Sequence, residues 1–112
     1  ISKLRDFANE RKWDQFHNPK NLVMALNGEL GELTEIFQWL DTENSKLEKL
    51  SDKDKERCKE ELADVFLYLI RLADKLEIDL IKEAHNKIEV NSKKYPIDLS
   101  KDNAIKYNQR DE

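Results

Sequence analysis

Apolar residues recur every three or four positions along this chain, which is the spacing of one face of an α-helix. The clearest case predicts a helix over residues 19 to 40. Asn18 and Pro19 supply an N-cap and a first helical residue for it. Its apolar stripe consists of Leu22, Leu26, Leu30, Leu33, Phe37 and Leu40, with Val23 and Ile36 widening it.

A second long helix is predicted to begin after Ser51 and to run to about Leu76. Ser51 and Asp54 have the spacing of a capping box, with Asp in place of the usual Glu or Gln. The stripe of this helix consists of Cys58, Leu62, Val65, Leu69, Leu72 and Leu76. Shorter helices are expected over residues 3 to about 15 and about 79 to 93. The polar segment 41–50 should connect the two long helices, with at most a short helical turn.

Composition supports an all-α protein. The chain has 112 residues with only two Gly and two Pro, and it is 38% apolar and 39% charged. A chain of this size buries a modest core. The pattern therefore predicts a four-helix-bundle-like fold completed by homo-oligomerisation, with a domain over residues 1–96 and a polar tail or arm over 97–112.

Charge and cysteine content narrow the class of protein. The net charge of −4 gives no basic face for nucleic acid. No apolar run reaches the roughly 18 residues of a membrane-spanning helix, so no membrane association is expected. Cys58 has no intrachain partner for a disulfide, which favours a reducing, cytoplasmic location. The chain begins at Ile1 rather than Met, so a trimmed N-terminus stays open.

Paired acids adjoin both long apolar stripes. Glu29 and Glu32 lie one turn apart on the first long helix, and Glu61 and Asp64 repeat that spacing on the second. If these helices pack antiparallel, four carboxylates converge and require a cation, for which Mg²⁺ or Mn²⁺ is suited. In so charged a chain, the same pairs are also expected on an ordinary solvated face, where we place Glu35.

Aromatic and basic residues lie near these acids. An aromatic pair beside a metal–phosphate site could stack a nucleotide base, and a basic row could meet phosphate oxygens. Core packing for the aromatic residues and solvation for the lysines are the alternatives. His17 is expected to form local hydrogen bonds. The candidate substrate-binding residues are Trp13, Trp39, Tyr68, Lys87, Asn91 and Lys94.

Together these residues resemble the all-α nucleoside triphosphate pyrophosphatases, and among them the MazG-like dCTP pyrophosphatase branch. The family pattern E-x-x-E followed by E-x-x-D is present as Glu29 to Glu32 and, after 28 residues, Glu61 to Asp64. The resemblance extends through FANERKWDQFHNPKNL, GELGELTEIFQW, EELADVFLYL and NSKKYP, in that order. It is weakest over residues 41–52, which puts substrate preference in doubt more than catalysis.

The resemblance implies Mg²⁺-dependent hydrolysis of a nucleoside triphosphate, dCTP or a modified dCTP in this branch, to the monophosphate and pyrophosphate. It assigns Glu29, Glu32, Glu61 and Asp64 to the metal, and Trp13, Trp39 and Tyr68 to the base and sugar. Lys87 and Asn91 are assigned to the substrate, with Lys94, Tyr95, Lys106 and Tyr107 as weaker matches. We expect Glu32 and Glu61 to be the catalytic residues and favour Glu32 as the general base.

The resemblance also implies dimers, or tetramers built from dimers, with sites near the subunit interfaces. Two alternatives stay open at this point. One is a non-catalytic helical oligomerisation module whose acids are surface charge. The other is a broad house-cleaning pyrophosphatase that removes non-standard nucleotides.

Overall fold

Residues 1–94 are described by the structure, a computed structural model, and every element in them is helical. Its elements are α1 (Ser2–Glu10), the 3₁₀ turn η1 (Trp13–Gln15), α2 (Pro19–Phe37), the 3₁₀ turn η2 (Leu47–Lys49), α3 (Asp52–Lys75) and α4 (Leu80–Lys94). The predicted all-α class is therefore confirmed. The chain forms two compact units, Ile1–Ile78 and a second one that begins at Asp79.

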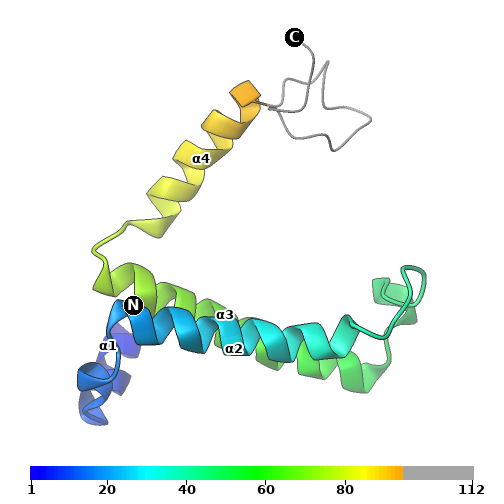
Figure 1. Cartoon of the computed structure of the whole chain (residues 1–112), viewed down its shortest axis with the longest axis horizontal. Helices are drawn as coiled ribbons and strands as arrows, with labels where there is room; N and C mark the ends of the chain where they lie inside the picture. Colours follow the sequence, from blue (N-terminus) through cyan, green and yellow to red (C-terminus); the bar gives the residue numbers. More distant parts are fainter. Residues whose placement is uncertain (95–112) are drawn as a thin grey trace. The chain divides into compact units, whose positions relative to one another are not determined.

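The first unit is built on two long antiparallel helices. α2 and α3 lie side by side along most of their length, with α1 at one end and the connecting segment at the other (Figure 1). Antiparallel packing places the middle of α2 beside the middle of α3. The acids predicted to converge lie in these two middle stretches.

Side-chain caps fix where the long helices begin. Asn18 Oδ1 accepts a hydrogen bond from the Asn21 backbone N–H at 2.9 Å, and Pro19 occupies the first helical position, as the sequence predicts. At α3, Ser51 Oγ accepts from the Asp54 N–H at 3.1 Å. α2 ends at Phe37, three residues before the predicted position.

The predicted first helix is too long. The structure has α1 only to Glu10, and Lys12 then adopts a left-handed conformation with φ of 56°. A residue with this φ cannot continue a right-handed helix, so the chain turns and forms η1 as a separate element. This turn places the Trp13 side chain against the ring of Phe7 in α1.

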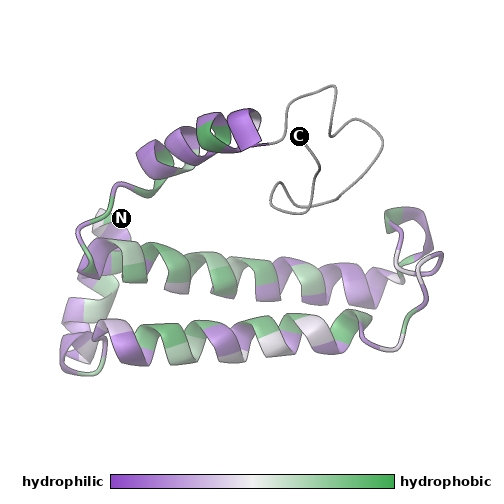
Figure 2. Ribbon diagram, turned by 45° about the horizontal axis from the view of Figure 1, so that its top comes forward, coloured by the Kyte–Doolittle hydropathy of each residue, from purple (hydrophilic) through white to green (hydrophobic). Residues whose placement is uncertain are grey.

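The core of the first unit is small. Its buried apolar residues are Ala8, Leu22, Ile36 and Ala73, and Leu22 is the only large one among the described residues that is fully buried. Parts of both predicted stripes face outward, because Leu30 is 43% and Leu62 is 55% exposed. Figure 2 shows α3 changing from hydrophilic near its start to hydrophobic in its second half. The single chain thus leaves much apolar surface uncovered.

In the second unit, α4 covers Leu80 to Lys94, close to the prediction. The Asp79 carboxylate accepts a hydrogen bond from the Lys82 N–H at 3.1 Å at its start. The predicted tail 97–112, which includes Lys106 and Tyr107, lies outside the described residues, and so does Tyr95. Within residues 1–94, no helix has the length and apolarity needed to cross a bilayer.

Candidate active site

Carboxylates from α2 and α3 meet where the two helices run side by side. Glu29 and Glu32 on α2 and Glu61 on α3 each offer one oxygen, and these atoms all lie within 4.8 Å of one another. The spacing of three residues puts the two α2 acids on one face. The antiparallel neighbour supplies the third acid, so the cluster follows from the helix pairing.

Two carboxylate oxygens of this cluster are buried and have no hydrogen-bond partner among the described residues. Glu29 Oε2 and Glu61 Oε2 are inaccessible to solvent, and neither has a hydrogen-bond partner within the part of the chain that the structure describes. Buried polar atoms are nearly always paired, because an unpaired one loses its hydration without replacement. An all-oxygen set of this kind fits a hard divalent cation such as Mg²⁺ or Mn²⁺.

Burial and mutual repulsion change the acidity of the cluster. Burial, followed by the close Glu32 carboxylate, raises the pKa of Glu61 to about 7. The same two causes raise the pKa of Glu29. Without a cation, therefore, the site favours a bound proton over a full set of negative charges.

Asp64 connects the acidic cluster to a neighbouring pocket. Its negative charge raises the pKa values of Glu29 and Glu61, although it is not one of the three residues with converging oxygens. It is instead one of the residues that line the pocket. On α3, the row Glu61, Asp64, Tyr68 and Arg71 has helical spacing, so the row runs from the acids into the pocket.

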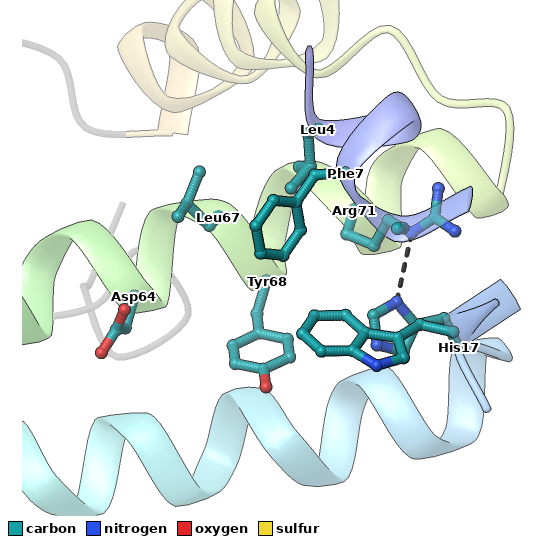
Figure 3. Close-up of a pocket in the computed structure, with 9 residues that line it drawn as sticks. Leu4, Phe7, His17, Asp64, Leu67, Tyr68 and Arg71 are labelled. Carbon is teal, nitrogen blue, oxygen red and sulfur yellow. Dashed lines mark hydrogen bonds between the residues drawn. The ribbon is translucent and has the colours of Figure 1, made fainter. Parts of the chain in front are cut away.

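The pocket encloses about 230 Å³ between α1, η1 and α3. Figure 3 shows Leu4 and Phe7 reaching in from α1, while Asp64, Tyr68 and Arg71 come from α3. The full lining is Leu4, Phe7, Ala8, Trp13, His17, Asp64, Leu67, Tyr68 and Arg71. An apolar, aromatic lining with few polar groups is typical of small-ligand sites.

Aromatic rings make up one wall of the pocket. The Phe7 and Trp13 rings meet edge to face, with centroids 5.4 Å apart and planes at 71°. The Trp13 and His17 rings are 5.6 Å apart and tilted. The Arg11 guanidinium lies 3.6 Å from the Phe7 ring centroid and covers it. This wall offers ring faces and edges on which a planar ligand can stack.

The structure brings some of the predicted residues together and leaves others apart. Trp13 and Tyr68 line the pocket beside Asp64. Trp39 follows the end of α2, is 87% exposed and is not part of the pocket lining. The candidates Lys87, Asn91 and Lys94 all belong to α4 in the second unit.

Several pocket residues were missed by sequence reasoning. The sequence pattern assigns no site role to Phe7, Leu67 or Arg71. A signal existed for Arg71, because it interrupts the apolar run LYLIRLA in the second half of α3. An arginine there must either turn outward or find buried partners. In the structure it is buried, with 5% of its surface exposed.

The fold and site define an all-α protein with a carboxylate cluster beside an aromatic pocket. A model of the MazG-like family matches residues 24–109, which is most of the chain and includes all four acids. The chain belongs to the MazG-like family.

Curated and solved proteins agree with this assignment. The chain is 42% identical over 102 residues to dCTP pyrophosphatase 1 of Bos taurus, and the match covers 91% of this chain. It is 40% identical over the same length to dCTP pyrophosphatase 1 of Homo sapiens. The match spans only 60% of either relative. A solved pyrophosphatase from Archaeoglobus fulgidus is 41% identical, with a TM-score of 0.78, covering 85% of this chain and 87% of that one.

Proposed function

We propose that this protein is a metal-dependent nucleoside triphosphate pyrophosphohydrolase. One observation carries the proposal: a cluster of carboxylates with two unpaired buried oxygens adjoins an aromatic pocket along one face of α3. The cluster suits the metal–triphosphate part of a nucleotide, and the pocket suits its base. The similarity to dCTP pyrophosphatase 1 and to the archaeal pyrophosphatase supports the same activity.

The proposed reaction is hydrolysis at the α-phosphorus. A water oxygen forms a bond to that phosphorus, and the bond between the α-phosphorus and the bridging oxygen to the β-phosphate breaks. The products are a nucleoside monophosphate and pyrophosphate, and the water gives up a proton. We assign this proton to Glu32, whose carboxylate is exposed and stands in the cluster.

Glu29, Glu32 and Glu61, whose oxygens converge, would hold the divalent cation, with Mg²⁺ favoured and Mn²⁺ as a substitute. We propose Asp64, one turn from Glu61 on α3, as a fourth ligand. When bound, the cation supplies positive charge to the phosphate oxygens and lowers the pKa of the attacking water. The chain itself holds the acids and the pocket wall in place relative to each other. Glu61 and Asp64 share a helix with Tyr68, so the acids and the pocket wall keep a fixed separation. We assign catalytic roles to Glu32 and Glu61.

Trp13 and Tyr68 would hold the base and sugar, and dCTP or a modified dCTP is the favoured substrate because of the named relatives. A broader house-cleaning role, removing non-standard nucleotides, is the second candidate. The pocket is lined mostly by apolar and aromatic groups, and such groups discriminate weakly between bases.

Pyrophosphate release from a panel of ribo- and deoxyribonucleoside triphosphates tests the function directly. We expect release with Mg²⁺, loss of release with EDTA and a preference for cytosine nucleotides. A similar rate for all bases would favour the broad role. No release from any nucleotide by the folded protein would overturn the proposal and leave an oligomerisation module as the alternative.

Metal affinity should depend on pH through Glu61. The pKa of its carboxyl is raised from 4.5 to about 7, so below pH 7 a cation must displace a proton. We expect Mn²⁺ affinity to fall by about tenfold per pH unit below 7 and to level off above it. Calorimetric titrations on either side of pH 7 measure this slope.

Stability without metal should show the opposite trend. A raised pKa means that the folded state favours the protonated carboxyl, so this contribution is complete below the ordinary pKa of 4.5 and is lost as pH rises through about 7. The Tm in EDTA should therefore fall as pH rises from about 4.5 to about 7, and Mn²⁺ should restore stability near pH 7. A metal affinity independent of pH would contradict the assignment of Glu61.

Self-association is the remaining part of the proposal. Met24 is 66% and Phe66 is 57% exposed on the two long helices, and Leu30 and Leu62 beside the acids are also exposed. Apolar surface of this extent is typical of an oligomer interface. A homo-oligomer, as a dimer or a tetramer, would cover it, and light scattering measures its mass.

Three earlier assignments stay predictions. They are the contribution of Lys87, Asn91 and Lys94 to substrate binding, that of Trp39 to the base pocket, and the cytoplasmic location. The expectation that the protein binds neither nucleic acid nor membrane is likewise untested.

A further inference from the structure

A buried arginine closes the end of the pocket. Arg71 is 5% exposed and ends the row on α3 that starts at Glu61. Its Nη2 donates a hydrogen bond to Asp14 Oδ1 at 2.8 Å, and its Nε donates to His17 Nδ1 at 3.3 Å, the contact marked in Figure 3. Both partners belong to the segment that contains η1, more than fifty residues away in the sequence.

These two partners flank the aromatic wall. Asp14 directly follows Trp13, and the His17 ring lies 5.6 Å from the Trp13 ring. Lys75, one turn beyond Arg71 on α3, also binds the Asp14 carboxylate. Contacts to α3 therefore hold both the residue that directly follows Trp13 and the His17 ring beside it.

The same group of charges holds α1. Asp74 lies three residues beyond Arg71, and its Oδ2 is 3.8 Å from Arg71 Nη1. That oxygen accepts a hydrogen bond from Arg5 Nε at 2.8 Å, and Arg5 lies on α1 between the pocket residues Leu4 and Phe7. Both segments that complete the pocket thus depend on ion pairs to one end of α3.

Apolar packing holds these segments less tightly. Ala8 is the only buried residue of α1, and η1 has none. Phe7 is 43%, Trp13 is 39% and Phe16 is 60% exposed. Because so little apolar surface is removed from water here, the partly buried hydrogen bonds of Arg71 carry much of the positioning.

Arg71 also fixes the proton on His17. An arginine can only donate, so His17 Nδ1 must accept and the proton of the neutral ring must lie on Nε2. Burial and the Arg71 charge lower the pKa of His17, in agreement with a neutral ring. The pocket wall thereby contains an imidazole in one defined tautomer.

We propose that Arg71 is a positioning residue that holds Trp13 and His17 in place and so sets nucleotide affinity and base selectivity. This inference rests on the proposed function. Arg71 acts through the aromatic wall, since its Nη2 and Nε already donate hydrogen bonds to Asp14 and His17.

Steady-state kinetics on Arg71→Met test the proposal. We expect KM for the preferred nucleotide to rise by about 10- to 100-fold, while kcat changes by less than about threefold, because the acids on α3 stay in place. The ratio of kcat/KM between bases should also fall. Arg71→Lys keeps a charge for Asp14 but cannot donate to His17 as well, so an intermediate KM is expected.

Arg57→Met is the matched control. Arg57 lies on the same helix, 3.9 Å from Asp54, and its guanidinium is part of neither the pocket nor the cluster. It should leave KM and kcat unchanged. An equal rise in KM in this control would mean that lost positive charge, and not positioning, explains the effect.

A spectroscopic measurement tests the same inference without turnover. Nitrogen NMR of the His85→Gln protein, which leaves His17 as its only histidine, should show a proton on Nε2 and none on Nδ1. Adding Arg71→Lys or Asp14→Asn should mix the two tautomers or alter exchange at the ring. These milder variants serve the purpose should Arg71→Met fail to fold.

The outcomes separate the two proposals. An active wild type with KM and tautomer unchanged in Arg71→Lys and Arg71→Met would overturn the positioning role and leave the proposed function standing. An inactive wild type with a fixed His17 tautomer that Arg71→Lys disturbs would remove the nucleotide function while showing the arginine contact. A changed tautomer with unchanged KM would also overturn the role in affinity.

Discussion

Replacing Glu61 with Gln is expected to reduce pyrophosphate release by more than about 100-fold, because one of the proposed cation ligands is lost. In EDTA the same variant should be more stable than wild type near pH 8. The amide removes a carboxyl whose pKa burial and Glu32 raise to about 7, and with it the repulsion from Glu29. Turnover and thermal unfolding, each with Mg²⁺ and with EDTA, measure these opposite effects.

Glu60→Gln provides the control for this prediction. Glu60 precedes Glu61 on α3, is exposed and is not part of the cluster. It should leave both turnover and metal-free stability near wild type. If Glu61→Gln folded and kept full turnover, or destabilised the metal-free protein, the cluster would not be a metal site.

Replacing Leu22 with Ala is expected to cost about 2–5 kcal/mol of unfolding free energy. Leu22 is 1% exposed and is the only large, fully buried side chain among residues 1–94. The truncation removes apolar contacts and leaves a cavity that the neighbouring helices can fill only in part. Denaturant unfolding at a fixed protein concentration measures the loss, since self-association would add to the stability.

Leu47→Ala makes the same chemical change at an exposed position. Leu47 lies in η2 and is 71% exposed, so the expected change is within about 0.5 kcal/mol. Equal losses in the two variants, or a loss below about 1 kcal/mol for Leu22→Ala, would show that the core of the single chain is not where the structure places it.

The two long helices could be predicted because local signals and packing agree. Their stripes repeat over several turns, and the caps at Asn18 and Ser51 mark where they begin. The meeting of acids from both helices followed from antiparallel pairing. The structure brings Glu29, Glu32 and Glu61 together, and it places Asp64 at the junction with the pocket.

The N-terminal segment could not be predicted in the same way. The sequence predicts a helix that continues to about residue 15, yet Lys12 has a left-handed backbone conformation and α1 ends before it. Asp14 binds Arg71 and Lys75, contacts that join residues far apart in the sequence and are absent from any local pattern. About half of the pocket lining comes from this N-terminal segment. The sequence therefore pointed to Trp13 but not to the neighbouring rings of Phe7 and His17 that form the wall with it.

The row on α3 also fixes the distance between the acids and the pocket; it consists of Glu61, Asp64, Tyr68 and Arg71. Ten residues of α-helix span about 15 Å, and a helix resists changes in length. A nucleotide bound as proposed, with its phosphates at Glu61 and Asp64 and its base beside Tyr68, would have to match the separation that the helix fixes between these residues. One residue inserted between Asp64 and Tyr68 would increase the distance between the acids and Tyr68 along the helix axis by about 1.5 Å. It would also rotate Tyr68 about that axis by about 100° relative to the acids. In the proposed site, helix geometry as well as side-chain chemistry would thus determine which nucleotides fit.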